Sequence, residues 1–212
     1  MRSLPRSTLQ DRGLVFVVDD DDAVREAIAG LLQVAGYRVQ PFDSSEALLA
    51  RAPAEEPACL VLDLMLPGET GLSLQQRLAE THPDVQVVFV TGHADVDRSV
   101  QAMKAGAVEF LTKPFSDAAL LAGVERALAR SRDIRAIRAE IASVAGRHAK
   151  LSPREREVMQ LVVAGLTNKD AAEKLGTRVI TVKIQRGNMM RKMQARSLPE
   201  LVTMASQLSI MN

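Results

Sequence analysis

The stretch VFVVDDDDAV, residues 15–24, sets four aspartates in a row directly after a short apolar run. Like charges so close together repel, so the run is either a solvated acidic surface or part of a site that faces a cation. A wholly apolar run of this length is typical of a buried strand, and its carboxylates would then lie at the edge of a sheet. The rest of the chain decides between these two interpretations.

Short apolar runs alternate with amphipathic stretches through the first half of the chain. We predict strands at residues 14–18, 37–42, 59–64, 85–91 and 108–111, and helices at 22–35, 45–51, 71–81, 95–105 and from 116 onward. Five strand–helix units in alternation predict an α/β fold, a doubly wound five-stranded parallel sheet with helices on both faces. Functional groups of such sheets lie at the carboxyl ends of the strands.

Polar side chains gather at those strand ends, and they are Asp19, Asp20, Asp63, Thr91 and Lys113. Carboxylates about 4 to 6 Å apart raise each other's pKa unless a divalent cation neutralises them. Mg²⁺ fits such a site because it takes a few hard oxygen ligands and bridges to phosphate. With Asp63 as nucleophile, the metal and Lys113 would offset the charge that develops on a transferred phosphoryl group.

Residues 14–127 resemble the receiver domain of two-component response regulators. The motifs that carry this resemblance are VFVVDDDDAV, VLDLMLPGETG (61–71), FVTGHAD (89–95) and LTKP (111–114). The resemblance implies a flavodoxin-like fold in which Asp63 accepts the phosphoryl group. It also implies a site for Mg²⁺ or Mn²⁺, with ligands from Asp19, Asp20, Asp63 and the backbone carbonyl of Met65.

The same resemblance implies a switch made of Thr91, Phe110 and Lys113. His93 is expected near the water that attacks the phosphoryl group. Asp21 and Asp22 are then expected at the start of the following helix, where negative charge suits the helix dipole.

Haloacid-dehalogenase-like phosphatases are an enzymatic alternative, because DDDAV at residues 20–24 fits their Asp-x-Asp-x-[Thr/Val] pattern. That family needs a further acidic metal motif after its lysine. Here only Asp117 and Asp133 follow, in stretches that predict helix, and Asp63 would have no role. We therefore expect that the protein is not an enzyme.

A long helix is predicted from residue 116 to about residue 146. Within it Ile134, Ile137, Ile141 and Val144 are spaced by three, four and three residues, as in a coiled-coil seam. The stretch is either an amphipathic connector that packs on a domain or a helix that pairs between protomers. The predicted organisation is a flexible leader (1–13), a receiver domain (14–127), a helical linker (128–149) and a C-terminal domain (150–212).

The last 60 or so residues hold only helical periodicity. In LSPREREVMQLVVAG (151–165), Ser152 is a predicted N-cap, Pro153 takes the first helical position and Glu155 follows the cap by three residues. Further helices are predicted in TNKDAAEKLG (167–176), RVITVKIQRGNMMRKMQA (178–195) and SLPELVTMASQL (197–208). Two short helices across a tight turn, the second rich in Lys and Arg, predict a helix-turn-helix within an all-α four-helix domain.

This segment resembles the LuxR-type, or NarL/FixJ-type, DNA-binding domain, and is most similar to the FixJ branch. The resemblance implies that Lys183 and Ile184 face bases and that Asn168, Lys169 and Thr181 lie near the DNA backbone. From the residues alone, Lys183 and Arg186 share a helix face with Gln185 on its flank, and Arg191 and Lys192 are candidates for phosphate contacts. Gln185 replaces the histidine common in the family, and Gly187 occupies a position that some members use for contact.

The net charge of +1 conceals two oppositely charged halves. Residues 14–116 hold 16 Asp and Glu against 7 Lys and Arg, whereas residues 150–212 hold 5 against 11. This asymmetry favours a cation as the partner of the first half and nucleic acid as the partner of the second. The single cysteine, Cys59, excludes an internal disulfide and is expected to be a buried strand residue.

No apolar run approaches the length of a membrane span, and residues 1–13 lack the apolar core of a signal peptide, so we expect a cytoplasmic protein. The expected function is phosphorylation-controlled transcriptional regulation. A sensor histidine kinase would donate the phosphoryl group, and a homodimer would then bind double-stranded DNA, paired through the receiver or through the linker helix. The alternative is a regulator whose receiver is a phosphorylation-independent dimerisation module.

Overall fold

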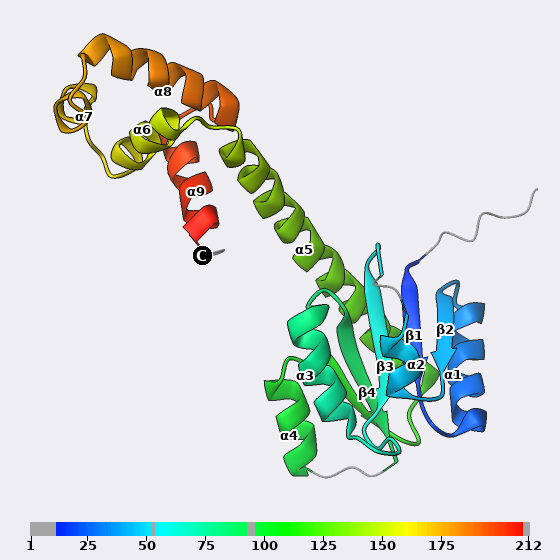
Figure 1. Cartoon of the computed structure of the whole chain (residues 1–212). Coiled ribbons are helices and arrows are strands. Elements are labelled where there is room, and N and C mark those ends of the chain that lie inside the picture. The colour runs from blue at the N-terminus through cyan, green and yellow to red at the C-terminus, as the bar shows by residue number, and fades with distance from the viewer. Residues whose placement is uncertain (1–11, 52–53, 93–95, 210–212) are drawn as a thin grey trace, which may run out of the picture. The chain divides into compact units, whose positions relative to one another are not determined.

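The computed structural model describes residues 12–51, 54–92 and 96–209. The ten strands and helices of the first part run in the order expected for a doubly wound sheet (Figure 1). They are β1 (Leu14–Val18), α1 (Asp22–Val34), β2 (Arg38–Phe42), α2 (Ser45–Leu49), β3 (Ala58–Asp63), α3 (Gly71–Thr81), β4 (Gln86–Thr91), α4 (Val96–Lys104), β5 (Glu109–Thr112) and α5 (Asp117–Ala149). Every predicted strand is present with its ends within one residue of the prediction.

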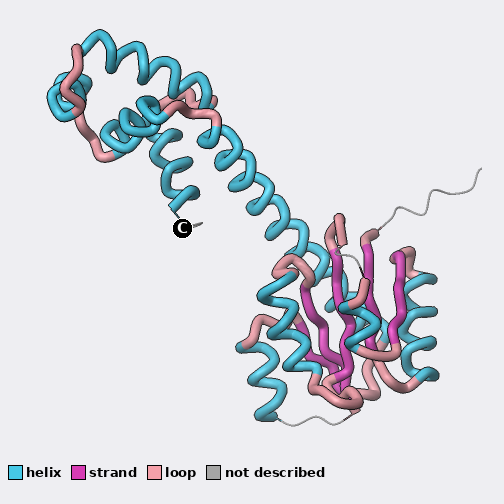
Figure 2. The backbone as a smooth tube through the Cα atoms, viewed as in Figure 1, coloured by secondary structure: helices cyan, strands magenta, loops and turns pink. Residues whose placement is uncertain are grey.

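The strands form one parallel sheet in the order β2-β1-β3-β4-β5 (Figure 2). The prediction of a doubly wound parallel sheet is therefore confirmed. Every residue of β1, β3 and β4 is buried, which explains why these strands are continuous apolar runs without alternating polar residues. Cys59 lies in β3 and is fully buried, as expected.

Each face of the sheet has its own apolar core. One core contains side chains of α2, α3 and α4, including Leu48, Leu74 and Ala102. The other contains side chains of α1 and α5, including Leu32 and Leu120. The strand residues alternate between the two cores, so the central strands are covered on both sides and only their ends are left for polar groups.

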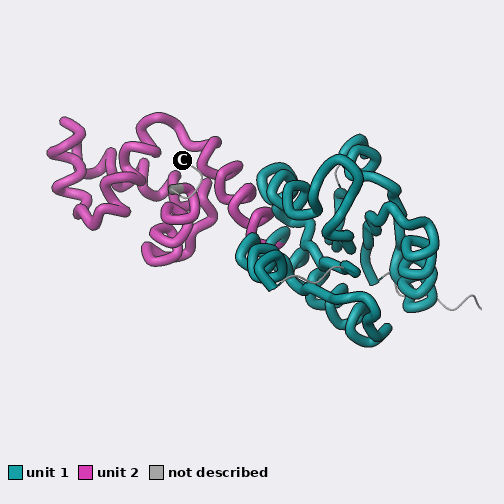
Figure 3. The backbone as a smooth tube through the Cα atoms, turned by 90° about the horizontal axis from the view of Figure 1, so that it is seen from below, with its two compact units in different colours: residues 1–135 teal, residues 136–212 magenta. Residues whose placement is uncertain are grey.

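Side-chain contacts hold the middle of helix α5 against the first unit. Ser131 is fully buried, and its hydroxyl accepts a hydrogen bond from the backbone N–H of Ala58 (3.1 Å). Arg135 pairs with Asp84 and donates to the backbone carbonyls of Ala54 and Glu55. The chain divides into two compact units after Arg135, inside the predicted linker (Figure 3).

The predicted seam of the linker is shared between the two units. Ile134 lines a hollow of the first unit together with residues of α3 and β4, and Val144 is buried in the core of the second. Ile137 remains 58% exposed. Since two of the four seam positions pack within a unit, little of the seam is left for pairing between protomers.

Helix α5 continues past Gly146 to Ala149, three residues beyond the predicted end. Glycine inside a helix costs about 1 kcal/mol relative to alanine. Burial of Val144, together with the hydrogen bond from the Arg147 guanidinium to the carbonyl of Met193 (2.9 Å), holds this last turn in place. None of the helices in the described part of the chain is long and apolar enough to cross a membrane.

The second unit adds four helices, α6 (Pro153–Val163), α7 (Asn168–Lys174), α8 (Val179–Met193) and α9 (Leu198–Ser209). The predicted N-cap and capping box of α6 are confirmed, with Ser152 and Glu155 bonded reciprocally. A second capping box joins Thr167 and Asp170 at the start of α7. The four-helix arrangement buries one core of Val, Leu, Ala and Met side chains, which agrees with the low aromatic content of the chain.

Candidate functional site

The four consecutive aspartates serve two different elements. Asp19 is buried and Asp20 exposed at the carboxyl end of β1. Asp21 is the N-cap of α1, where its carboxylate accepts hydrogen bonds from the N–H groups of Ala23 (2.9 Å) and Val24 (3.2 Å). Asp22 begins the helix. The prediction that the second pair of aspartates starts the helix is therefore confirmed.

Asp22 forms an ion pair with Arg25, three residues further along the same helix. The guanidinium of Arg25 also donates to the backbone carbonyl of Asp19 (2.7 Å). Arg25 therefore fixes the end of β1, a role that the sequence analysis did not assign. The sequence feature that could have indicated this ion pair is the three-residue spacing between Asp22 and Arg25, which places opposite charges on the same helix face.

Asp19 and Asp63 lie side by side at the carboxyl edge of the sheet, because β1 and β3 are paired in parallel up to Val18 and Leu62. The ammonium of Lys113 donates to Asp19 Oδ2 (2.7 Å) and to Asp63 Oδ2 (3.0 Å). Each remaining carboxylate oxygen accepts from a backbone N–H, Asp19 Oδ1 from Asp21 and Asp63 Oδ1 from Met65. The two carboxylates are thus held in a defined orientation.

Opposing effects act on the pKa of Lys113. Partial burial of the ammonium lowers the pKa, while the hydrogen bonds and charges of Asp19 and Asp63 raise it. The net effect is a pKa above the ordinary value for lysine, so Lys113 is a stable cation at neutral pH. It supplies one positive charge to a site that holds three carboxylates.

The residues at this edge fit a divalent metal ion. Oxygens of Asp19, Asp20 and Asp63 all lie within 4.8 Å of one another, and they form the one such acidic group among the described residues. All the donors are hard oxygens, which suits Mg²⁺, Mn²⁺ or Ca²⁺ better than a softer metal. Met65, whose carbonyl is the further predicted ligand, is tied to this group by the hydrogen bond from its N–H to Asp63 Oδ1 (3.1 Å).

The predicted switch residues come from the neighbouring strands. Thr91 is fully buried at the end of β4, and its carbonyl accepts the N–H of Lys113 (2.8 Å). The peptide bond between Lys113 and Pro114 is cis. Phe110 is partly buried, and its ring lies 6.1 Å from that of Phe89 in a tilted arrangement. His93 lies outside the described residues.

Gly71 shows how tightly α3 begins against this site. A Cβ at Gly71 would lie 2.4 Å from the backbone oxygen of Asp63 and 2.9 Å from the ring of Phe89. Since real Cβ atoms do not come so close to a backbone oxygen, only glycine permits the helix to start here. The close packing of this turn keeps the backbone of Asp63 in place.

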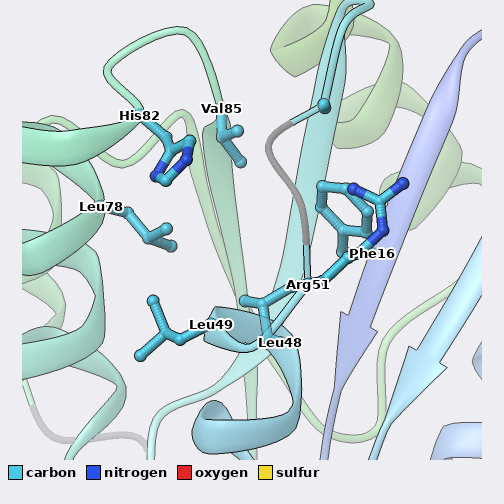
Figure 4. Close-up of a pocket in the computed structure, with 8 residues that line it drawn as sticks. Phe16, Leu48, Leu49, Arg51, Leu78, His82 and Val85 are labelled. Carbon is cyan, nitrogen blue, oxygen red and sulfur yellow. The ribbon is translucent and has the colours of Figure 1, made fainter.

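An apolar hollow on the first unit is separate from the acidic group. It is lined by side chains of α2, α3 and the sheet, among them Leu48, Leu78, His82 and Val85 (Figure 4). The guanidinium of Arg51 lies 4.6 Å from the centre of the Phe16 ring beside it. No described carboxylate of the acidic group lines this hollow, so it is not the phosphoryl or metal site.

In the second unit, α7 and α8 form the predicted helix-turn-helix, joined by the short turn around Gly176. The buried side of α8 consists of Val182, Met189 and Met193. Met189 and Met193 follow Val182 by seven and eleven residues, so all three lie on one face of the helix. The opposite face is therefore free of the core. A helix held in this way can present its outer face to a partner.

The structure places the predicted DNA-binding residues in two groups. The exposed group consists of Lys169, Lys183, Ile184, Arg191 and Lys192. The partly buried group consists of Asn168, Thr181, Gln185 and Arg186. Arg186 donates to the Asn168 side-chain oxygen (3.0 Å), which links α8 to the start of α7. Arg191 donates to Asn188 one turn earlier (3.0 Å).

Lys192 is also held by a contact that sequence spacing does not reveal. Its ammonium donates to Glu155 Oε2 (2.7 Å), 37 residues earlier in the chain. That carboxylate is buried and also accepts the N–H of Ser152 (2.7 Å). The hydrogen bonds from Lys192 and Ser152 outweigh burial and lower the pKa of Glu155 below its usual value.

We expect Glu155→Gln to destabilise the second unit at neutral pH by about 1 kcal/mol, the scale of a partly exposed ion pair, because the glutamine can still accept the N–H of Ser152 in the capping box. Because the folded-state pKa is lowered, this contribution is complete above the unfolded-state pKa and is lost as the pH falls through the folded-state pKa. Calorimetric unfolding of the wild type and the variant from pH 7 to pH 3 should show the difference shrinking in acid.

Lys192→Met, which keeps the length of the side chain, is the matched variant for the partner. A double-mutant cycle of the two substitutions should give a coupling at pH 7 that becomes smaller as the pH is lowered towards 3. A difference between wild type and Glu155→Gln that is constant over the whole range would contradict this account.

The fold and these two sites define a two-part protein, an acidic cation site on a doubly wound sheet followed by a helix-turn-helix. The model of the response regulator receiver domain matches residues 15–125, and that of the bacterial regulatory proteins of the luxR family matches residues 149–205. The chain belongs to the two-component response regulators that carry a LuxR-type DNA-binding domain. It is a phosphorylation-controlled transcriptional regulator of this family.

Similar proteins match over nearly the whole chain. Nodulation protein W of Bradyrhizobium diazoefficiens is 43% identical over 199 residues, 94% of this chain and 88% of that protein. The transcriptional regulatory protein FixJ of Azorhizobium caulinodans is 44% identical over 191 residues, 90% of each chain. The solved structure of the response regulator StyR has 41% sequence identity and a TM-score of 0.79, covering 92% of this chain and 98% of that one.

Proposed function

We propose that Asp63 accepts a phosphoryl group from a sensor histidine kinase, and that the phosphorylated protein dimerises and binds promoter DNA. The observation that carries this proposal is the group of Asp19, Asp20 and Asp63, with Lys113 bonded to two of its members. Asp19 and Asp63 both bond to Lys113, and Asp63 is the more accessible of the two, with its side chain 12% exposed against 1% for Asp19. No other described carboxylate belongs to such a group.

Asp19 and Asp20 would hold Mg²⁺ together with Asp63 and the carbonyl of Met65. A bound Mg²⁺ supplies charge neutralisation and a bridge to phosphate oxygens. Lys113 would donate to the phosphoryl oxygens, because its ammonium already bonds to Asp63 Oδ2. Phosphorylation adds about 1.5 to 2 negative charges. The buried hydroxyl of Thr91 and the half-buried ring of Phe110 would respond to them.

The dimer surface would be the outer face of α4 with β5. Val96, Val100 and Met103 lie four and seven residues apart on α4 and are 77%, 44% and 46% exposed. Three apolar side chains in one exposed stripe favour burial against a second copy of the chain. The linker helix has less exposed apolar surface available for pairing, because Ile134 packs within the first unit and Val144 within the second.

The test of the function as a whole is DNA retention by the full-length protein with and without beryllofluoride, a phosphoryl mimic. Genomic fragments should be retained at lower protein concentration when the mimic and Mg²⁺ are present. Equal retention in both states would favour the alternative in which the receiver is a phosphorylation-independent dimerisation module. Absence of retention above competitor DNA in either state would contradict the proposal.

DNA recognition should depend on Lys183 and Arg191 in different ways. Lys183→Ala should cost about 1 to 3 kcal/mol on a specific duplex and little on random DNA, because the exposed ammonium would bind a base edge. Arg191→Ala, the matched control on the same helix, should weaken both duplexes alike and lower the salt slope by about 1 through a lost phosphate contact. Equal losses on both duplexes for Lys183→Ala would refute the base-facing assignment.

A further inference from the structure

Helix α8 carries exposed apolar side chains at its amino-terminal end. Val179 is 39% exposed, Ile180 59% and Ile184 57%. Single exposed apolar residues are common on protein surfaces and need no explanation. Ile180 and Ile184 are different because they are one turn apart and therefore adjacent on the helix surface.

These two isoleucines lie on the side of α8 that faces away from the core. The buried side is marked by Val182, Met189 and Met193. From Ile180, positions four, seven and eleven residues later share one face, and this face is opposite to the buried one. The outer stripe of α8 is therefore Ile180, Ile184, Gly187 and Arg191.

Gly187 leaves a gap in this stripe that the fold of the domain does not require. Nothing lies within 4 Å of a Cβ built at Gly187, and its backbone is not among the positions of positive φ. A glycine there costs helix stability without relieving any contact within the domain. A residue as small as Gly187 is therefore explained by a partner molecule outside the domain that comes close to the backbone of α8.

The charges around the stripe indicate what that partner is. No residue of α8 is acidic, and Lys183 and Arg191 are exposed beside or within the outer stripe. A polyanion with apolar groups on its surface fits this combination better than an apolar protein surface does. In the major groove of DNA, the 5-methyl group of thymine is the apolar group that base pairs present.

We propose that Ile180 and Ile184 recognise neighbouring thymine methyl groups in the major groove, and that Gly187 lets the helix come close enough for both contacts. This proposal rests on the proposed DNA-binding function and adds a base preference to it. Lys183 sits between the two isoleucines in sequence and would bind an adjacent base edge. We therefore expect each DNA half-site to contain two thymines whose methyl groups lie close enough together to contact two side chains one α-helical turn apart.

The experiment compares thymine with uracil, which lacks only the methyl group. Duplexes are selected from a randomised pool by the full-length protein with beryllofluoride, and the best duplex is resynthesised with one thymine at a time replaced by deoxyuridine. Fluorescence anisotropy should show about a fourfold loss of affinity at each of two positions per half-site, and no loss elsewhere. Ile180→Ala and Ile184→Ala should each abolish the discrimination at one of these positions and leave the other unchanged.

Matched variants separate recognition from folding. Ile184→Val should keep most of the discrimination, and Arg191→Ala should weaken thymine and uracil duplexes by the same factor. Circular dichroism checks that each variant retains its helix content. Wild-type protein that binds every uracil duplex as tightly as the thymine duplex would overturn the inference while leaving DNA binding intact. Failure to select any duplex would instead overturn the proposed function, and the inference with it.

Discussion

Asp63→Asn is expected to reduce phosphorylation of the protein to background. In the wild type, incubation with Mg²⁺ and a small phosphodonor should label one residue, mapped by mass spectrometry of peptides. The nucleophile must lie beside both the cation and the lysine and must be accessible to the phosphodonor. Asp63 accepts a 3.0 Å hydrogen bond from Lys113 and belongs to the acidic group, and its side chain is 12% exposed, against 1% for Asp19, the other carboxylate bonded to Lys113. Asparagine keeps the shape of the side chain but removes the nucleophilic carboxylate.

Asp22→Asn is the matched control, because Asp22 belongs to the same acidic run but starts α1 and pairs with Arg25. This variant should be labelled like the wild type. Asp20→Asn should be labelled weakly and should need more Mg²⁺, since the exposed carboxylate would bind metal without bonding to Lys113. Labelling that persists in Asp63→Asn, or that proceeds in the presence of a chelator, would contradict the assignment.

The second large effect is expected in self-association. Beryllofluoride with Mg²⁺ should convert the protein from monomer to dimer in sedimentation velocity experiments, and Val100→Asp should keep it monomeric. Full burial of one Val or Met side chain contributes about 1.5 to 3 kcal/mol. Burial of the exposed parts of Val96, Val100 and Met103 from both copies would therefore contribute on the scale of the few kcal/mol that separate a mostly monomeric from a mostly dimeric population.

In a two-fold interface, Val100→Asp places two carboxylates near each other and buries them without partners. Val34→Asp is the matched control, because Val34 is 87% exposed at the end of α1, away from the proposed face. This control should still dimerise. A Val100→Asp protein that dimerises normally would point to another surface, and Ile137→Asp would then test the linker helix. A monomeric wild type that gains DNA affinity with the mimic would contradict the dimer route itself.

The sequence by itself determined the sheet and the composition of the acidic edge. β1 is wholly apolar, and β3 and β4 are apolar except at their ends, so their identity as buried parallel strands could be predicted without tertiary information. The carboxyl ends of parallel strands meet at one edge, and Asp19, Asp63 and Thr91 could therefore be assigned to one place. Local signals also sufficed for the caps at Asp21 and Ser152.

Contacts between distant residues were decided only by the tertiary structure. Glu155 and Lys192 are 37 residues apart, and Arg135 and Asp84 are 51 apart. Helix periodicity assigned Ile134 and Val144 to one seam, but packing divided them between two units. The periodicity of a helix shows which residues share a face and does not show what covers that face, because the covering atoms come from other parts of the chain.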